Sequence, residues 1–147
     1  MPENAHLKRI VCLTDDDEDD RMLLHEALLA LGGPLEILEL SSAAQLIAQF
    51  SGSDGGFADY VFLDINMPGM DGLQCLEKVR NLGTTQTRII IYTAESSRES
   101  MQRAFSLGAD FYAVKPNRFE DLKDLVKRAF SKSWNTLGPE DRIFHIT

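Results

Sequence analysis

Several polar residues stand directly after short apolar stretches of the sequence. Three aspartates, Asp15–Asp17, follow the first stretch, and Asp64 follows a later one. A hydroxyl residue, Thr93, ends another stretch, and Lys115 comes directly after the last. If these stretches are neighbouring strands of one sheet, their ends bring carboxylates, a hydroxyl and an ammonium group together at one edge.

This set of groups favours a particular chemistry. Carboxylates held close together repel one another and resist ionising together, and a hard divalent cation with oxygen ligands relieves that repulsion. Mg²⁺ suits the set, because it takes one or two carboxylates beside phosphate oxygens and waters. Lys115 and Thr93 supply the charge and the donor that a transferring phosphoryl group needs. A carboxylate that attacks phosphorus forms an acyl phosphate, so the residues predict aspartyl phosphorylation.

The stretches that must position these residues have the composition of buried strands. They are short, apolar and rich in β-branched or aromatic residues, and they cover Ile10–Thr14, Leu35–Leu40, Tyr60–Leu63, Arg88–Thr93 and Asp110–Val114. Segments with apolar residues at helical spacing alternate with them, with stripes in Leu23–Leu31, Ala43–Phe50, Leu73–Val79, Met101–Phe105 and Leu122–Phe130. Strands and helices in alternation predict an α/β fold, a doubly wound parallel sheet with helices on both faces.

Four stretches of this sequence together resemble the receiver domains of two-component response regulators. The stretches are Val11–Asp17, Val61–Gly72, Ile91–Ala94 and Val114–Pro116, each at the end of a predicted strand. The resemblance covers roughly residues 7–131. It implies a flavodoxin-like fold with five parallel strands in the order 2-1-3-4-5. It also implies a receiver domain at residues 1–131, followed by a C-terminal extension at 132–147 with no separate output domain.

The resemblance implies a role for each acidic residue of the site. Asp64 resembles the phosphoacceptor. Asp16 resembles the direct ligand of Mg²⁺, for which Mn²⁺ is an alternative, and Asp15 resembles the ligand that acts through water. Asn66 resembles the residue whose backbone carbonyl completes the metal site.

It also implies the groups that respond to the phosphoryl group. Thr93, Ala94 and Lys115 resemble the residues that contact it. Tyr112 resembles the aromatic switch residue, which turns inward when Thr93 moves toward the phosphoryl group. In this family the bond between Lys115 and Pro116 is cis, an isomer mainly open to X–Pro bonds.

Two further positions are expected to set the lifetime of the phosphorylated state. In receivers, the residues two after the acceptor and two after the threonine lie near the path of the attacking water. Here they are Asn66 and Glu95, both polar and able to orient a water without blocking it. We therefore predict a short-lived phosphorylated state.

The acidic run also invites other interpretations. An EF-hand calcium loop would use acidic residues at its first, third, fifth and twelfth positions, here Asp15, Asp17, Asp19 and Glu26. The sixth position requires glycine but holds Asp20, which argues against a calcium loop. We instead expect Asp17, Asp19 and Asp20 to begin the first helix, where negative charge favours the helix dipole, and Asp71 to open the third.

The predicted function is signalling by a single-domain response regulator rather than enzymatic turnover. A histidine kinase or histidine phosphotransfer protein would phosphorylate Asp64, and phosphorylation would switch binding to an unknown downstream protein. One alternative is a phosphorelay intermediate that passes the phosphoryl group on. Another is a structural interaction domain that never carries phosphate.

Composition and charge limit the other functions. A length of 147 residues suits one domain, and a net charge of −8 without a basic stripe argues against direct binding to nucleic acid. No apolar run is long enough to span a membrane and no signal peptide is evident, so we expect a cytoplasmic protein without membrane attachment. Cys12 and Cys75 lie in apolar contexts and are predicted to be buried free thiols.

The segment Ser131–Thr147 is too short for an output domain, yet it carries several large apolar residues: Trp134, Leu137, Ile143, Phe144 and Ile146. A disordered terminus is normally more polar. Two hypotheses account for this composition. Either the segment folds back over its own domain, or it packs on a second copy or on the partner protein. Of the latter two, our hypothesis is a weak homodimer that the segment stabilises.

Overall fold

The computed structural model describes residues 8–52, 57–84, 86–130 and 142–144. The strands are β1 (Arg9–Thr14), β2 (Leu35–Leu40), β3 (Tyr60–Leu63), β4 (Arg88–Thr93), β5 (Phe111–Val114) and β6 (Ile143–Phe144). The helices are α1 (Glu18–Leu29), α2 (Ala43–Ser51), α3 (Gly72–Asn81), α4 (Arg98–Ser106) and α5 (Phe119–Ala129). The first five strands lie within one residue of their predicted bounds.

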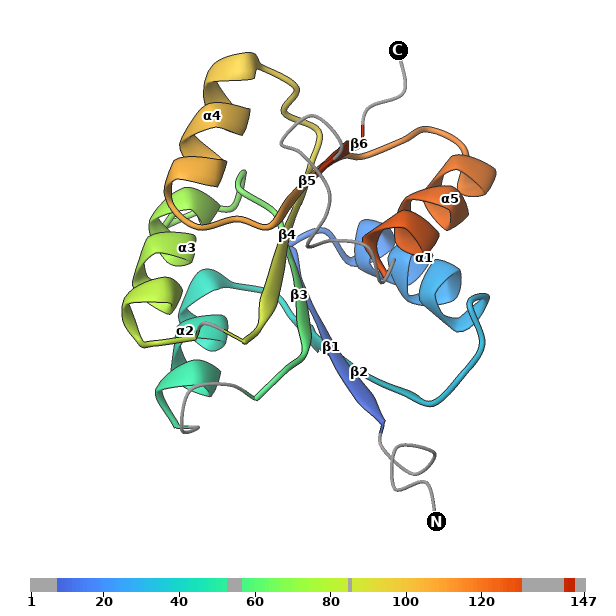
Figure 1. Ribbon diagram of the computed structural model, residues 1–147, viewed down its shortest axis with the longest axis horizontal. Helices are drawn as coiled ribbons and strands as arrows, with labels where there is room; N and C mark the ends of the chain where they lie inside the picture. Colours follow the sequence, from blue (N-terminus) through green and yellow to red (C-terminus); the bar gives the residue numbers. More distant parts are fainter. Residues whose placement is uncertain (1–7, 53–56, 85, 131–141, 145–147) are drawn as a thin grey trace.

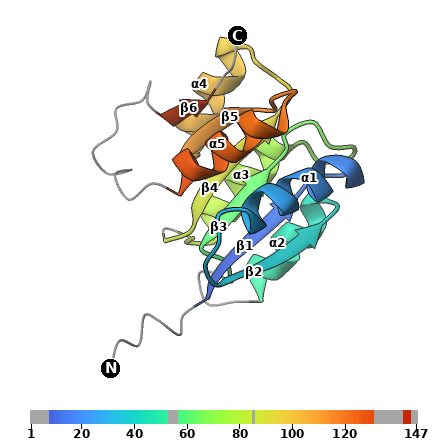
Figure 2. The same ribbon diagram turned by 90° about the vertical axis from the view of Figure 1, so that its right-hand side faces the viewer.

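All strands pair in parallel in one sheet with the order β2-β1-β3-β4-β5-β6. Helices α2, α3 and α4 cover one face of this sheet, and α1 and α5 cover the other (Figures 1 and 2). The doubly wound architecture and the order of the first five strands are therefore confirmed. Because the strand order reverses beside β1, the carboxyl ends of β1 and β3 border the crevice where such sheets bind ligands.

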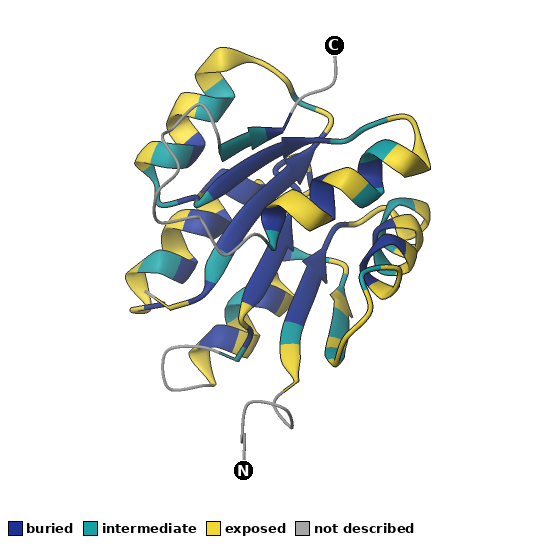
Figure 3. Ribbon diagram, turned by 45° about the vertical axis from the view of Figure 1, so that its right-hand side comes forward, coloured by how far each residue is buried: buried dark blue, intermediate teal, exposed yellow. Residues whose placement is uncertain are grey.

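Alternation along the strands fills a core on each face of the sheet (Figure 3). Cys12 and Val61 point to the side of α2, α3 and α4, while Val11 and Phe62 point to the side of α1 and α5. The inner strands β3 and β5 are buried along their whole length, as expected for a parallel sheet covered on both faces. This double burial makes the ends of β3 and β5 firm supports for the residues that follow them.

Helix starts are fixed by short polar side chains. The Asp17 carboxylate accepts a hydrogen bond from the backbone N–H of Asp20, so Asp17 is the N-cap of α1. Asp71 caps α3 in the same way through the N–H of Gln74. Both caps agree with the sequence interpretation, and the helix that begins at Glu18 leaves no room for a twelve-residue calcium loop.

The sixth strand corrects the prediction of a five-stranded sheet. Ile143 and Phe144 pair with Tyr112 and Ala113 of β5, and Phe144 is buried against the core beside α5. The strand was missed because two residues are too few to show an alternating pattern. This part of the C-terminal extension thus folds onto its own domain, whereas Trp134, Leu137 and Ile146 lie outside the described residues.

Both cysteines are free and buried, as predicted. Cys12 lies in β1 and Cys75 in α3, within one apolar cluster between the sheet and its α2–α4 layer. Burial raises the pKa of the Cys12 thiol to about 11 and that of Cys75 to about 12. Among the described helices, none has the length and apolarity required to cross a membrane.

Candidate functional site

Backbone hydrogen bonds extend the parallel ladder one residue past the strands and thereby place the polar residues. The N–H of Asp64 donates to the carbonyl of Thr14 at 3.0 Å, and the N–H of Lys115 donates to the carbonyl of Thr93 at 2.7 Å. The N–H of Asp15 bonds to β2 in the same manner. The predicted convergence at the carboxyl edge of the sheet is therefore present in the structure.

The ammonium group of Lys115 is the centre of this cluster. Its Nζ lies 2.8 Å from Oδ2 of Asp15, 2.9 Å from Oδ2 of Asp64 and 2.7 Å from Oδ2 of Asp20. An ammonium has three N–H donors, so each donor has a carboxylate partner. Residues far apart in the sequence, from α1 and from the positions directly after β1, β3 and β5, are joined at this one atom.

Burial and charge act in opposite directions at this site. Burial raises the pKa of Asp15 to about 6, even though hydrogen bonds from Lys115 and from the N–H of Asp17 lower it. The pKa of Lys115 is raised above its usual value, because its hydrogen bonds to Asp15 and Asp20 and the charge of Asp64 outweigh the opposing effect of burial. Three carboxylates thus hold a firmly protonated lysine at this edge of the sheet.

Asp15, Asp16 and Asp64 could hold a metal ion together. Each offers a carboxylate oxygen, and these oxygens lie within 4.8 Å of one another. Asp15 and Asp64 are buried while Asp16 is exposed, so the group opens toward solvent on one side. An all-oxygen set with an open side suits a hard cation that keeps part of its water shell, so these residues fit Mg²⁺.

The carboxylate of Asp64 is held on both sides. One oxygen accepts the 2.9 Å hydrogen bond from the backbone N–H of Asn66, and the other accepts from Lys115. The start of α3 closes on the same loop, where the N–H of Gly72 donates to the carbonyl of Ile65. A Cβ on Gly72 would collide with the carbonyl of Asp64 and with the Cα of Ile65. Only glycine at position 72 lets α3 begin this close to Asp64.

The hydroxyl of Thr93 faces the loop after β4. It is buried and accepts long hydrogen bonds of 3.3 Å from the side-chain amide of Asn66 and from the N–H of Glu95. The hydroxyl of Tyr112 donates to the carbonyl of Glu95 at 2.8 Å, and its side chain is fully buried. Tyr112 is therefore already buried without a phosphoryl group on Asp64, and its role as the switch residue stays a prediction.

The structure brings together most of the residues selected from the sequence. Asp15, Asp16, Asp64 and Lys115 meet directly, while Asn66, Thr93, Glu95 and Tyr112 form a second, connected group. Ala94 follows Thr93 and is exposed. The roles assigned to these residues stay predictions.

Two residues with evident effects on the site were missed. Asp20 was assigned only to the start of α1, although its carboxylate contacts the ammonium of Lys115. Gly72 was given no role of its own at the site. The expected cis bond before Pro116 is also wrong, because none of the peptide bonds in the described residues is cis. Trans is the isomer that X–Pro bonds favour by about 0.5–1 kcal/mol.

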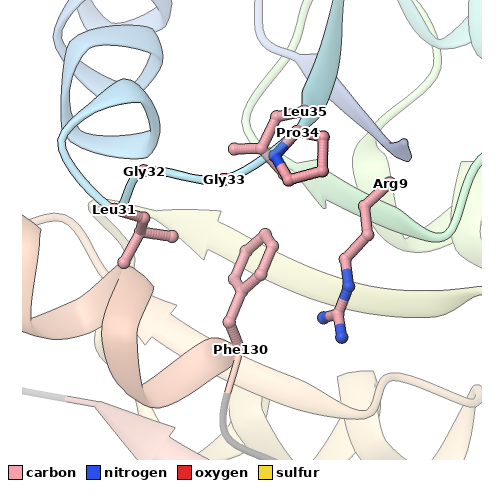
Figure 4. Close-up of a pocket in the computed structure, with 7 residues that line it drawn as sticks. All are labelled: Arg9, Leu31, Gly32, Gly33, Pro34, Leu35 and Phe130. Carbon is pink, nitrogen blue, oxygen red and sulfur yellow. The ribbon is translucent and has the colours of Figure 1, made fainter. Parts of the chain in front are cut away.

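A pocket of about 360 Å³ lies at the opposite edge of the sheet, between the end of α1, the start of β2 and Phe130 (Figure 4). Leu31, Pro34 and the ring of Phe130 line it, with Arg9 at one side. It contains none of the carboxylates that surround Lys115 and stands apart from the site.

Comparison with known proteins identifies the family. The sequence profile of the response regulator receiver domain matches residues 11–127. The chain belongs to this family. It is 34% identical over 121 residues to the probable chemotaxis protein CheY of Rhizobium etli, an alignment that covers 82% of this chain and 91% of that protein.

Larger relatives match over only part of their length. The chain is 30% identical over 129 residues to hybrid signal transduction histidine kinase L of Dictyostelium discoideum, and 35% identical over 108 residues to the transcriptional regulatory protein CiaR of Streptococcus pneumoniae. These alignments cover 85% and 67% of this chain, but only 7% of the kinase and 48% of CiaR. The shared part is the receiver domain.

Solved structures agree with this membership. The chemotaxis protein CheY4 of Vibrio cholerae superimposes with a TM-score of 0.68 at 26% identity, over 83% of this chain and 98% of CheY4. The phosphorylated cyanobacterial phytochrome response regulator RcpA gives a TM-score of 0.76 at 19% identity, over 90% of this chain and 98% of RcpA. At that identity, RcpA supports the fold alone.

Proposed function

We propose that this receiver is a single-domain response regulator that accepts a phosphoryl group on Asp64 and thereby changes its binding to another protein. The observation that carries the proposal is the meeting of Asp64 with Lys115, Asp15 and Asp16 at the carboxyl edge of the sheet. A switch of this kind acts through the population of its phosphorylated form rather than through turnover of a substrate.

The phosphoryl transfer uses one oxygen of Asp64 as the nucleophile. In the unphosphorylated protein, Lys115 and the N–H of Asn66 occupy the two oxygens. An Asp64 oxygen attacks the phosphorus of a phosphohistidine, the new O–P bond forms, and the bond from phosphorus to the imidazole nitrogen breaks. Lys115 then donates to an oxygen of the transferred group and offsets its negative charge.

A divalent cation supplies the remaining positive charge. Asp15, Asp16 and Asp64 would hold Mg²⁺, or Mn²⁺ in its place, with the Asn66 carbonyl as a further ligand. When bound, the ion neutralises charge on the carboxylates and on the phosphoryl oxygens. Asp16 is the exposed member of the three and has the freest access to an arriving ion.

Thr93 and Tyr112 would carry the change to the surface. Thr93 accepts only long hydrogen bonds of 3.3 Å, so little holds its hydroxyl where it is, and a contact with the phosphoryl group would draw it toward Asp64. Ala94 would contribute its backbone N–H to the same group. Because the carbonyl of Glu95 is bonded to Tyr112, a shift of this loop changes the support of the tyrosine hydroxyl.

The phosphorylated state is expected to be short-lived. Asn66 and Glu95 are polar, lie on the loops beside Asp64 and Thr93, and would orient an attacking water. Substitution by long basic residues, Asn66→Arg or Glu95→Lys, should change the rate of phosphate release. Equal rates in wild type and both variants would contradict this part of the proposal.

The phosphodonor would be a histidine kinase or a histidine phosphotransfer protein, and we expect the protein to act in the cytoplasm. A weak homodimer also remains part of the proposal. Because β6 already covers the outer edge of β5, self-association along that edge requires β6 to move. Sedimentation of the full chain and of a chain ending at Ser131, each with and without beryllofluoride, tests this. Monomers throughout at roughly tens of micromolar would exclude the homodimer.

Loading with a phosphoryl mimic tests the central proposal. Beryllofluoride and acetyl phosphate should modify the wild-type protein only when Mg²⁺ is present, and should leave Asp64→Ala unmodified. Isothermal titration measures the first reagent and intact mass the second. Equal loading of both proteins would exclude Asp64 as the acceptor. Loss of label to an added histidine phosphotransfer protein would favour the phosphorelay alternative.

A further inference from the structure

Asp20 differs from the other two carboxylates that contact Lys115. The side chains of Asp15 and Asp64 are 5% and 7% exposed, whereas that of Asp20 is 35% exposed. Asp15 and Asp64 belong to the group of oxygens that could hold a metal, and Asp20 does not. Nevertheless, the contact of Asp20 with the ammonium, at 2.7 Å, is the shortest of the three.

The position of Asp20 is set by the helix rather than by the metal group. It lies in the first turn of α1, where its backbone N–H is bonded to the carboxylate of Asp17. Its side chain leaves that turn toward the end of β5 and reaches Lys115 across 95 residues of sequence. The contact therefore uses no oxygen of the group that could hold a metal.

The hydrogen bonds of Lys115 to the three carboxylates compete with its proposed hydrogen bond to the phosphoryl group. If a cation binds, oxygens of Asp15 and Asp64 turn to it, and Asp20 becomes the carboxylate that retains the ammonium. A phosphoryl group on Asp64 then needs a donor from the same ammonium. The phosphoryl group also brings a charge of about −1.5 to −2 close to Asp20. The phosphoryl group and the Asp20 carboxylate then both interact with the single positive charge of Lys115.

We propose that Asp20 is a positioning residue that retains Lys115 in the unphosphorylated state and competes with the phosphoryl group for it. This inference rests on the proposed function, because it assumes that Lys115 contacts the phosphoryl group. Asp20 thus sets how readily the phosphorylated state forms, without itself binding the metal.

Asp20→Asn is the informative variant and Asp19→Asn is its matched control. Asparagine keeps an oxygen that can accept from Lys115 but removes the charge. Asp19 lies in the same helical turn and is exposed, so Asp19→Asn removes the same charge from the same end of α1. A second variant, Asp20→Ala, removes both the charge and the acceptor.

The experiment measures beryllofluoride affinity at saturating Mg²⁺, and separately Mg²⁺ affinity, by isothermal titration. Asp20→Asn and Asp20→Ala should bind beryllofluoride about twofold to fivefold more tightly than wild type, the range expected for one partly exposed ion pair. Asp19→Asn should stay close to wild type. Mg²⁺ affinity should be similar in Asp20→Asn and Asp19→Asn. The two variants should therefore differ in beryllofluoride affinity but not in Mg²⁺ affinity, a difference that a merely structural defect would not produce.

Two results would overturn the inference. Equal gains in Asp20→Asn and Asp19→Asn would reduce the effect to net charge, and weaker binding by the Asp20 variants would mean that Asp20 helps Lys115 reach the phosphoryl group. Failure of the wild-type protein to bind beryllofluoride is a different outcome, because it contradicts the proposed function itself.

Discussion

The hydroxyl of Tyr112 donates a 2.8 Å hydrogen bond to the carbonyl of Glu95, which joins the middle of β5 to the loop between β4 and α4. Tyr112 is also paired with Ile143 of β6 on its other side. The residue therefore connects the loop that follows Thr93 to the outer edge of the sheet.

Replacing Tyr112 with phenylalanine should loosen this connection. Tyr112→Phe keeps the buried ring but removes the donor, so the free energy of unfolding should fall by about 0.5–1.5 kcal/mol. Amide exchange in the loop of residues 94–97 should become faster than in wild type. An unchanged urea midpoint together with unchanged exchange would mean that the hydrogen bond contributes nothing.

Gly72 should prove essential to the geometry around Asp64. The added Cβ in Gly72→Ala meets backbone atoms of Asp64 and Ile65, so we expect a loss of roughly 1–3 kcal/mol in stability and weaker Mg²⁺ binding. Gly52→Ala is the control, because its Cβ would make only ordinary contacts of 3.7 and 4.0 Å with backbone oxygens of α2. Urea unfolding and metal titration measure both effects, and equal behaviour of the two variants would refute the steric argument.

Arg80 links α3 to the loops that precede β4 and β5, at the end of the sheet opposite the site. Its guanidinium donates to the carbonyls of Gly108, Thr84 and Thr87 and forms a 2.7 Å ion pair with Asp110.

Arg80→Ala should therefore lower the free energy of unfolding by roughly 2–4 kcal/mol, because it leaves half-buried acceptors without their charged donor. Lys78→Ala, an exposed change in the same turn of α3, should cost much less. Chemical denaturation measures the free energy of unfolding of both variants. A decrease below about 1 kcal/mol for Arg80→Ala would contradict the expectation.

Asp16 and Asp17 are adjacent, but their substitution by alanine should affect different properties of the protein. Asp16 contributes to the potential metal group, while the carboxylate of Asp17 caps α1. Asp16→Ala should weaken Mg²⁺ binding much more than Asp17→Ala does. Asp17→Ala should instead lower stability by about 0.5–2 kcal/mol. Metal titration and thermal unfolding give the two rankings, and a reversed order for Mg²⁺ would place the metal ligand one residue further on.

Phe144 should make β6 a stabilising part of the domain. It is 7% exposed and packs on the core beside α5, so Phe144→Ala should lower the free energy of unfolding by about 3 kcal/mol, the lower end of the range for a buried phenylalanine. Phe119, which is 39% exposed, provides the control through Phe119→Ala. Similar urea midpoints for both variants would show that β6 adds little to stability.

The sequence was most informative where a pattern repeats. The alternation of buried strands with amphipathic helices was sufficient to predict ten of the elements, and Asp15 and Asp64 each directly follow a predicted strand. Asp20 could not be predicted as a partner of Lys115, since a first-turn aspartate already has a local reason to be there and the contact spans 95 residues. The need for glycine at position 72 depends on how closely α3 approaches Asp64, which no local pattern encodes.

The burial of the two cysteines makes them reporters of motion within the native protein. Only a thiolate reacts readily with an alkylating reagent, and the raised pKa values of Cys12 and Cys75 keep both thiols protonated near neutral pH. Labelling must therefore wait until β1 or α3 opens to solvent. Because Cys12 lies in an inner strand of the sheet and Cys75 in a covering helix, their two labelling rates compare opening of the sheet with detachment of its outer layer.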